Sequence, residues 1–562
     1  MQTLVARHRF AVQRPTTAAF WVFAVLVPLA FLGVFFVAPV ANLFTRGFSD
    51  GFEAVARILT SGRTATLLRN TISQTILGTG ISVIFGVPIA YLLYRTRFPG
   101  KGALQALVMV PFVLPTVVVG VAFRSLLRSG GLLASLGIDQ TFTAVLLGLV
   151  FFNISVVVRT VGSLWERLDP RQEQAARSLG AGPWRTFATV TLPALAPAIA
   201  SAAALVSLFC ITAFGVVLVL GGARYGTIET EIYQRTTLFL DLSGAAVLSI
   251  VQLFVIAGVL WFSNWATTRH DAALALTGGR YGLQKWNWHN PADLLAAIIC
   301  GIAVIGLIAF PLFGLIIRSL HDGLGNWSLI NYQNLNAAGV LISPATALMN
   351  SLRAGALAAA IALTMGLLLA LVLSRRPESR IAKKAIKMFD AFVMLPLGVS
   401  SVTVGFGFLI TLTRPFFGVD LRISGLLIPF AQAVVAVPLV VRTLLPVLRA
   451  VDPRMRQAAA MLGASPLQVL RTIDLGLALR AIGLAAGFAF ATSLGEFGAT
   501  SFLARPDAPT LPVLIFRLLS RPGQENYGMA LAASVILGLL TAAIMLIFEH
   551  LRSSSFRPRV NT

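Results

Sequence analysis

Long apolar stretches alternate with short polar ones along most of the chain. Because the hydrocarbon core of a bilayer is about 30 Å thick, a helix needs about 20 apolar residues to cross it. Twelve stretches reach that length, namely Ala18–Phe44, Asn70–Tyr94, Ala103–Leu127, Phe142–Leu164, Ala194–Leu220, Gly244–Trp265, Ala292–Ile317, Asn350–Leu373, Phe389–Leu412, Ser424–Leu445, Ala478–Leu503 and Gly528–Phe548. The pattern predicts an all-α polytopic membrane protein with about twelve transmembrane helices.

Two of the polar stretches are copies of each other. The segment 169–193 recurs 283 residues later as 452–476, and both contain Asp-Pro-Arg, then Gln-Ala-Ala and Leu-Gly-Ala in the same register. Each copy predicts a short helix (Arg171–Leu179 or Arg454–Leu462), a glycine where that helix stops, and a second short helix begun by a proline. So many matches at one offset indicate a duplication.

Further matches extend the repeat into the flanking apolar stretches. Asn70 matches Asn350 at an offset of 280, and Phe214-Gly215 matches Phe497-Gly498 at an offset of 283. Because each copy has six predicted helices, both enter the membrane from the same side, as in a parallel duplication. The predicted parts are a first repeat, 1–266, a cytoplasmic linker, 267–291, and a second repeat, 292–562.

Composition and charge support a membrane protein. Of the 562 residues, 57% are hydrophobic and only 12% are charged, too few to cover a soluble globule. The net charge of +23 comes from lysines and arginines in short loops beside apolar stretches, which indicates membrane topology rather than nucleic-acid binding. With the first helix as a retained signal anchor, these loops and both termini are predicted to be cytoplasmic.

Motifs for catalysis are missing from the sequence. The chain has no G-x-x-x-x-G-K-[ST] phosphate-binding loop and no H-E-x-x-H motif. Cys210 and Cys300 lie in apolar stretches, which leaves neither a disulfide framework nor a metal cluster. We therefore expect a chain that is not an enzyme and binds no cofactor. If ATP drives its activity, the ATPase is another polypeptide.

The duplicated segments resemble the cytoplasmic EAA loop of ABC-importer permeases, in which E-A-A is followed three residues later by G and then by I-x-L-P. The first copy has Gln174-Ala175-Ala176, Gly180 and Leu192-Pro193. The second has Gln457-Ala458-Ala459 and Gly463, but Leu475-Gly476 in place of L-P. In that family the loop docks on a separate ATPase subunit. The alternative is an ordinary amphipathic interfacial helix.

This resemblance implies the type I ABC importer permease fold, with two six-helix halves joined in one chain. It assigns ATPase coupling to Gln174, Ala175, Ala176, Gly180, Gln457, Ala458, Ala459 and Gly463. It also implies alternating access in a bacterial cytoplasmic membrane. The expected partners are ABC ATPase subunits in two copies, which bind the ATP, and an extracytoplasmic substrate-binding protein.

Two further motifs bear on the substrate. Leu220–Tyr233 and Ser493–Gly498 resemble the thiamine and ferric-iron branch of these permeases. The run L-G-E-F-G-A, which overlaps the second motif, also resembles sulfate and molybdate permeases, so an oxyanion stays open as the substrate.

Four residues are candidates for the pathway and the outer gate. Glu229, Glu231 and Tyr233 lie in a loop that resembles the outer contact of these permeases with the binding protein. The alternative is a plain interfacial connection with solvated glutamates. Glu496 lies in the eleventh apolar stretch, where an ionisable group is expected to face the bundle interior or a wet cavity. It either lines the pathway and touches a cationic substrate or makes a structural hydrogen bond to a helix terminus.

A rival from another class is an ion-driven secondary transporter. Such a transporter needs no ATPase and should carry paired charges within the membrane at matching positions of both halves. Glu496 has no such partner, because the matching residue is Ala213. A non-transporting scaffold gives no reason for duplicated coupling loops.

Overall fold

The computed structural model of the protein describes residues 15–222, 225–268, 284–336, 342–375, 379–412, 418, 420–421 and 425–553. The basic N-terminus, most of the linker 267–291 and the basic tail lie outside the described residues. The cytoplasmic placement of both termini, which depends on those charges, stays a prediction.

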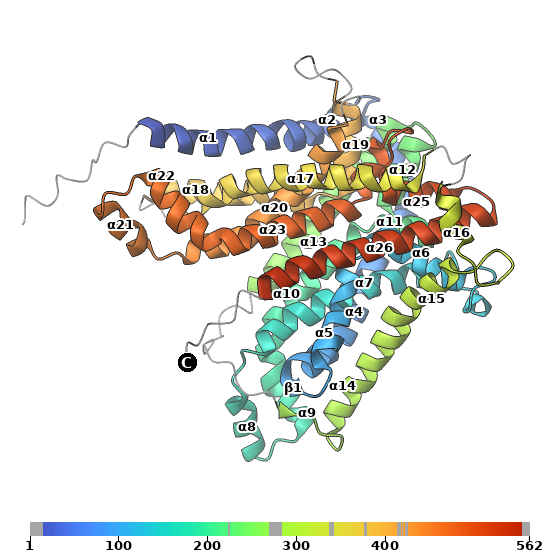
Figure 1. Cartoon of the computed structure of the whole chain (residues 1–562), viewed down its shortest axis with the longest axis horizontal. Coiled ribbons are helices and arrows are strands. Elements are labelled where there is room, and N and C mark those ends of the chain that lie inside the picture. The colour runs from blue at the N-terminus through green and yellow to red at the C-terminus, as the bar shows by residue number, and fades with distance from the viewer. Residues whose placement is uncertain are drawn as a thin grey trace, which may run out of the picture.

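Nearly all described elements are helices (Figure 1). The first repeat contains α1 (Pro15–Leu32), α2 (Ala38–Gly47), α3 (Phe52–Leu59), α4 (Gly62–Arg95), β1 (Thr96–Arg97), α5 (Lys101–Met109), α6 (Thr116–Leu127), α7 (Phe142–Trp165), α8 (Pro170–Ser178), α9 (Pro183–Thr186), α10 (Leu192–Ile211), α11 (Gly215–Leu220), α12 (Ile228–Thr237) and α13 (Leu242–Thr268). The remainder contains β2 (Gln284–Lys285), α14 (Pro291–Gly301), α15 (Phe310–Ser319), α16 (Ile330–Gln333), α17 (Pro344–Leu373), α18 (Arg380–Met394), α19 (Ser401–Thr411), α20 (Leu427–Ala450), α21 (Pro453–Met461), α22 (Pro466–Val469), α23 (Leu475–Gly495), α24 (Gly498–Leu503), α25 (Leu511–Ser520) and α26 (Gln524–Ser553).

The prediction of an all-α membrane protein is confirmed. Within the described residues, 10 continuous helices are long and apolar enough to span a membrane, and two further candidates are bent pairs. The third and ninth predicted spans were wrong as single helices, because α5–α6 bends by 102° and α18–α19 by 93°. At the first break Pro115 is extended (ψ 138°), and proline disfavours helix in the residue before it. The second break follows Pro396 and Gly398.

The fifth and eleventh predicted spans also end early. Helix α10 stops at Ile211 and α23 at Gly495, and each is followed by a corner and a short helix, α11 or α24. Apolar residues continue through both corners, so hydrophobicity alone extended the predictions to Leu220 and Leu503. We refer to residues 212–214 and 496–497 as the two corners.

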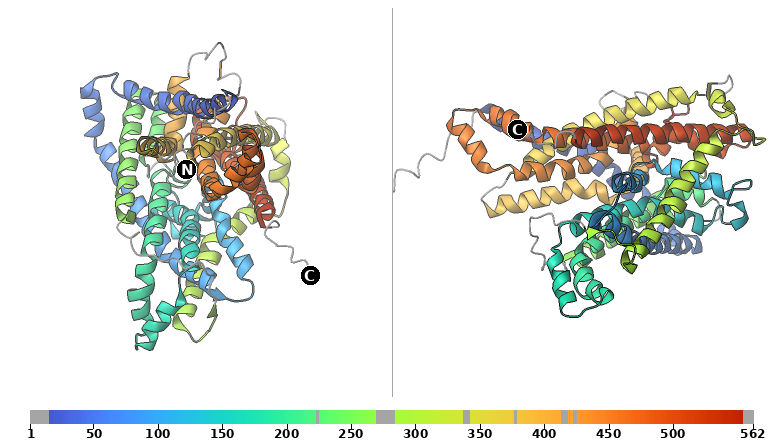
Figure 2. Two further views of the ribbon diagram at one scale, coloured as in Figure 1. Left: turned by 90° about the vertical axis from the view of Figure 1, so that its left-hand side faces the viewer. Right: turned by 60° about the horizontal axis from the view of Figure 1, so that its bottom comes forward.

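The two halves interlock. Helix α1 of the first repeat packs along α17 of the second, whereas α14 packs along α4 of the first. Figure 1 shows the resulting two arms, which diverge toward the ends that carry α8–α9 and α21–α22, and the views in Figure 2 show the same separation. The repeats in the sequence are therefore not two separate bodies in space.

Equivalent glycines bring equivalent helices into close contact. A Cβ atom on Gly86 of α4 would lie 2.6 Å from Val157 of α7, and one on Gly366 of α17 would lie 2.5 Å from Val440 of α20. Such spacing leaves no room for a side chain, so these small residues are explained by helix packing.

The end of the linker lies beside the loop that follows α4. Strand β1 pairs in parallel with β2, with Thr96 opposite Gln284. Trp286 packs against Phe98 and Trp288, with ring centroids 6.2 Å and 4.0 Å apart. The chain thus returns to the end of the first repeat that carries α8 before it enters the second repeat.

Candidate functional site

The two duplicated segments fold alike, starting with their N-termini. The Asp169 carboxylate accepts a hydrogen bond of 2.9 Å from the Arg171 backbone N–H, and Asp452 does the same for Arg454. Aspartate is a preferred residue at this position because it satisfies an amide that has no partner inside the helix. A proline follows in the first turn of α8 and of α21, so both helices begin one residue earlier than predicted.

The C-termini of these helices are also identical. Gly180 and Gly463 both have φ of +84°, a left-handed conformation that glycine adopts without strain. The following amide closes the helix in each copy, with Ala181 N–H donating to Ala176 O at 3.1 Å and Ala464 N–H donating to Ala459 O at 3.0 Å. Helices α9 and α22 then begin at prolines, as the sequence predicted.

Both segments lie at the tips of the diverging arms (Figure 1), and both expose apolar side chains. Leu179 and Leu462 are each 88% exposed, and Trp184 is 70% exposed. Of the residues predicted to couple, Gln174, Ala175, Gly180, Gln457, Ala458 and Gly463 are exposed, whereas Ala176 and Ala459 are partly exposed. Exposed apolar side chains rimmed by polar ones are typical of a protein-binding surface.

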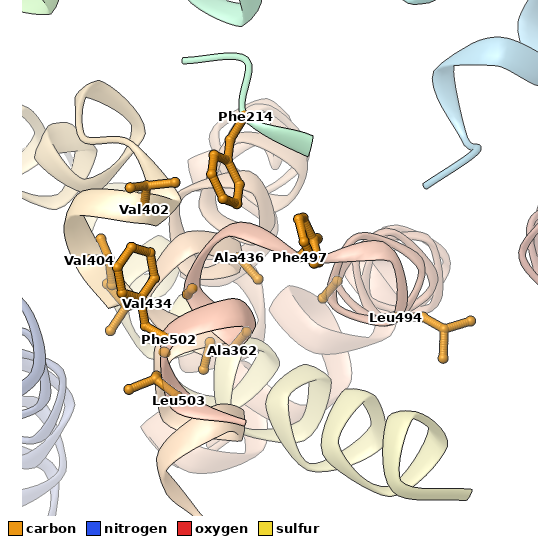
Figure 3. Packing of buried hydrophobic residues seen from close by; sticks show 14 of the residues in the cluster. Phe214, Ala362, Val402, Val404, Val434, Ala436, Leu494, Phe497, Phe502 and Leu503 are labelled. Carbon is orange, nitrogen blue, oxygen red and sulfur yellow. The ribbon is translucent and has the colours of Figure 1, made fainter. Parts of the chain in front are cut away.

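The two corners meet between the halves. The rings of Phe214 and Phe497, which match in the repeat, stack with centroids 5.4 Å apart and planes 16° apart. Both are buried, and Figure 3 shows them approaching from separate elements. A Cβ atom on Gly215 would lie 2.5 Å from Thr116 Oγ1, so the corner also fits closely against the broken third span. The halves thus meet here, while the ends that carry α8 and α21 diverge (Figure 1).

Glu496 lies at the second corner rather than inside a helix. Its carboxylate accepts hydrogen bonds from the Ala499 N–H at 2.8 Å and the Thr500 N–H at 3.1 Å, at the start of α24. The structural alternative, a hydrogen bond to a helix terminus, is therefore what the structure shows. Glu496 is partly exposed as a whole residue. Next to it, a cavity of about 180 Å³ includes Pro115, Thr492 and Gly495 in its lining.

The predicted outer-loop residues lie in α12 and are largely buried. Glu229 has no exposed surface and accepts hydrogen bonds from Gln252 Nε2 at 2.8 Å and Ser400 Oγ at 2.6 Å. In this conformation Glu229 therefore cannot contact a docked protein. Because Ser400 belongs to the second repeat, Glu229 instead links the halves. The alternative of a solvated glutamate is wrong.

Glu231 and Tyr233 are held by neighbours as well. Glu231 is 6% exposed and forms ion pairs with Arg63 at 2.7 Å and Arg235 at 3.3 Å. Tyr233 packs edge-on against Phe214 and Phe502, each at 5.4 Å between ring centroids. Tyr233 therefore contacts the closed corner directly and reaches the second repeat.

Two asparagines that matched in the sequence hold equivalent short helices, α12 and α25. Asn70 Nδ2 donates to Gly226 O at 2.9 Å, before α12, and Asn350 Nδ2 donates to Pro509 O at 3.3 Å, before α25. Sequence reasoning used this match only as evidence of duplication. Thr227 and Thr510, which directly follow the two accepting carbonyls, also match at an offset of 283, and this second match is the signal that could have identified the contact.

A cavity of about 400 Å³ lies between α6 and α25–α26, away from α8 and α21 (Figure 1). Its lining includes Arg124, Arg128 and Arg521 but only one carboxylate, Asp139. The Arg124 Nε is buried with no hydrogen-bond partner among the described residues, and Arg128 lies 4.0 Å from the Tyr527 ring centroid. Sequence analysis missed this positive surface. Among the described residues, no group of His, Cys, Asp and Glu is placed to hold a metal ion.

The duplicated bundle, its broken spans and its exposed loops define a membrane transport protein with two matched halves. Residues 82–273 match the model of the family described as binding-protein-dependent transport system inner membrane component. The chain belongs to this family and is a fused permease subunit of an ABC importer. Such permeases work with a separate ATPase and a substrate-binding protein, so the predicted partner classes and the absence of an ATPase in this chain are confirmed.

The relatives cover one or both halves. The thiamine transport system permease protein ThiP of Escherichia coli (strain K12) is 29% identical over 86% of this chain and 88% of its own length. ThiP of Brucella abortus (strain 2308) is 28% identical over 94% of each chain. A probable sulfate transport system permease protein, cysT of Nephroselmis olivacea, is 31% identical over 44% of this chain and 88% of its own length.

One solved structure is also similar, a bacterial ABC transporter involved in the import of the acidic polysaccharide alginate. The match covers 45% of this chain and 96% of that one, with 18% identity and a TM-score of 0.38.

Proposed function

We propose that this permease imports thiamine. The carrying observation is that the two ThiP relatives match it over 86% and 94% of its length, including both halves. None of the relatives described above is named for iron, so we no longer favour ferric iron beside thiamine. The sulfate relative matches only 44% of the chain, and an oxyanion is the second candidate to be tested.

The mechanism that we infer is alternating access. Stacked Phe214 and Phe497 hold the two corners together (Figure 3), while α8 and α21 lie at the tips of diverging arms (Figure 1). This arrangement corresponds to a state in which the pathway between the halves opens toward the coupling loops. Closure of the ATPases around ATP would draw the two loops together, part the corners and accept substrate from the binding protein.

We further propose that each coupling loop docks one ATPase copy, so that one chain assembles with two. The eight predicted coupling residues form or flank the exposed surfaces of α8 and α21, and small alanines allow a close approach. ATP then binds to the partner, and this chain carries no cofactor. We place the chain in the bacterial cytoplasmic membrane with both termini and both loops in the cytoplasm, since its family is described as an inner membrane component.

Glu496 is our candidate for contact with the substrate, because thiamine carries a positive thiazolium ring and Glu496, a partly exposed residue, lies next to Phe497 at the corner where the halves meet. Glu496→Gln retains the length of the side chain but removes its charge. We expect a higher half-saturating concentration of thiamine-loaded binding protein or a lower uptake rate. Unchanged values of both would exclude Glu496 from the pathway.

The test is uptake of labelled thiamine into proteoliposomes that contain the permease, its ATPase and, outside, its binding protein. We expect uptake that needs internal ATP and the binding protein and that excess sulfate does not inhibit. Uptake of sulfate instead would select the oxyanion. Uptake that survives without ATP but collapses with the ion gradient would refute the ABC mechanism.

A further inference from the structure

Polar clusters lie beneath both coupling helices, at matching positions of the repeat; Arg95, Thr191 and Asp474 are buried in them, whereas Glu173, Arg375 and Arg456 are partly exposed. The first consists of Arg95 at the end of α4, Glu173 on α8 and Thr191 just before α10. The second consists of Arg375 after α17, Arg456 on α21 and Asp474 just before α23. The members match at the same offsets, 280 for the arginines that follow the long helices and 283 for the other two pairs.

In the first cluster the carboxylate belongs to the coupling helix. Glu173 lies 3.3 Å from the Arg95 guanidinium and accepts a hydrogen bond of 3.0 Å from Thr191 Oγ1. Arg95 also donates to Leu168 O at 3.4 Å, at the end of the fourth span. The side chains are only 7% (Arg95) and 16% (Glu173) exposed. One cluster thus joins α4, the segment after α7, α8 and the base of α10.

In the second cluster the carboxylate has moved to the base of the span. Asp474 is 1% exposed and lies 2.7 Å from Arg456 on the coupling helix and 3.0 Å from Arg375. Arg456 also donates to Leu448 O at 3.3 Å. The same four elements are therefore joined as in the first half, with the acidic group on the opposite side of the contact.

These clusters are the main anchors of the coupling helices. Neither α8 nor α21 contains a buried residue, so apolar packing does not hold either helix in place. A buried charge that loses its partner is strongly destabilising, which makes each cluster a stiff contact rather than an adaptable one. Hydrogen bonds to charged groups also fix orientation better than apolar contacts do.

We propose that the two clusters are the mechanical links that convert movement of each coupling helix into movement of the spans behind it. Their members are positioning residues, since none of them lies on the exposed docking surface. This inference rests on the docking role of the coupling loops but not on the identity of the substrate. It also explains why Glu173 and Thr191 differ from Arg456 and Asp474, because each pair is one of two ways to build the same link.

The test transplants one arrangement into the other half. Glu173→Arg alone leaves two arginines without a carboxylate, and Thr191→Asp alone leaves two carboxylates on one arginine. The double variant E173R/T191D recreates the second cluster within the first half. The reciprocal double variant is R456E/D474T. Thr189→Asp is the matched control, because it places the same charge two residues away on an exposed position.

The measurement is ATP hydrolysis in proteoliposomes, with and without the binding protein carrying the ligand with which it purifies from the host. In each single variant we expect stimulation by the binding protein to fall at least tenfold, with basal hydrolysis within about twofold of the unchanged protein. The double variants should recover stimulation to within about twofold, and Thr189→Asp should resemble the unchanged protein.

Two results would overturn the proposal. The first is normal stimulation in the single variants, and the second is a double variant that folds, as judged by its melting temperature, but stays as impaired as the singles. If Glu173→Arg does not fold, Glu173→Gln replaces it, with a smaller loss of stimulation expected and normal stimulation again counting against the link. Because the binding protein carries its native ligand, this experiment tests the link even if the substrate is not thiamine.

Discussion

Replacing one ring of the stacked pair at the corners should shift the permease toward its outward-open state. Phe214 and Phe497 belong to different halves, so their stack exists only while the corners are together. A stacked aromatic pair contributes about 0.5–1.5 kcal/mol beyond the area that it buries. Leucine at either position retains most of the apolar burial in both states, so Phe214→Leu removes mainly the stack. A loss of about 1 kcal/mol changes the ratio of the two states about fivefold.

The assay is ATP hydrolysis by the reconstituted complex without binding protein. We expect Phe214→Leu and Phe497→Leu each to raise it about fivefold. The double variant should add little, because either change alone removes the contact. Phe123→Leu is the control, since Phe123 packs edge-on against Phe151 at 5.7 Å within one half. Basal hydrolysis equal to that of the control, or a double variant that multiplies the single effects, would refute the gating role of the stack.

Three further predictions concern the turn after α8, the short helix α12 and the cavity between α6 and α25–α26. Gly180→Val forces a β-branched residue to φ of +84°, which costs more than about 1–2 kcal/mol, and should lower transport per ATP hydrolysed, whereas Gly182→Val, at φ of −64°, should not. Asn70→Ala removes the hydrogen bond to Gly226 O and should destabilise the protein by about 1 kcal/mol, seen as a lower melting temperature; an unchanged value would show that this bond contributes nothing. The double change R124Q/R521Q should raise the concentration of binding protein for half-maximal ATPase stimulation at low salt and weaken its salt dependence, if acidic groups dock there; an unchanged salt dependence would place docking elsewhere.

The features that sequence predicted well are those encoded locally. Ten spans follow from apolar length, and α8 and α21 follow from an aspartate, a proline and a glycine at fixed spacing. The breaks in the third and ninth spans were missed because Pro115 and Pro396 interrupt stretches that are apolar throughout. Hydrophobicity summed over a window of residues does not show where a helix breaks and changes direction.

The features that sequence missed depend on distant partners. Glu229 was predicted to lie in the outer loop that contacts the binding protein, with a solvated glutamate as the alternative, but Ser400, 171 residues away, and Gln252 satisfy its carboxylate in the interior. The clusters under the coupling helices were hidden for another reason. When the two repeats are aligned, Glu173 matches Arg456, and the opposite charges look like a mismatch. Only the position of Asp474 in the structure shows that the acidic and the basic residue have exchanged places within equivalent contacts.

The interlocking of the halves carries no sequence signal at all. Lipid, the first repeat or α17 could each cover the apolar surface of α1, and only the assembled bundle shows that α17 covers it. The same holds for α14 against α4. Domain limits drawn from the repeat therefore describe the duplication and not the packing.

The most direct test of the whole account is native mass spectrometry of the complex purified in mild detergent from its host. One copy of this chain with two ATPase copies, and with a binding protein that carries thiamine, is the predicted result, since a single chain presents both coupling loops. This chain alone, or two copies of it around one ATPase pair, would contradict the claim that the two halves of one chain form the complete permease.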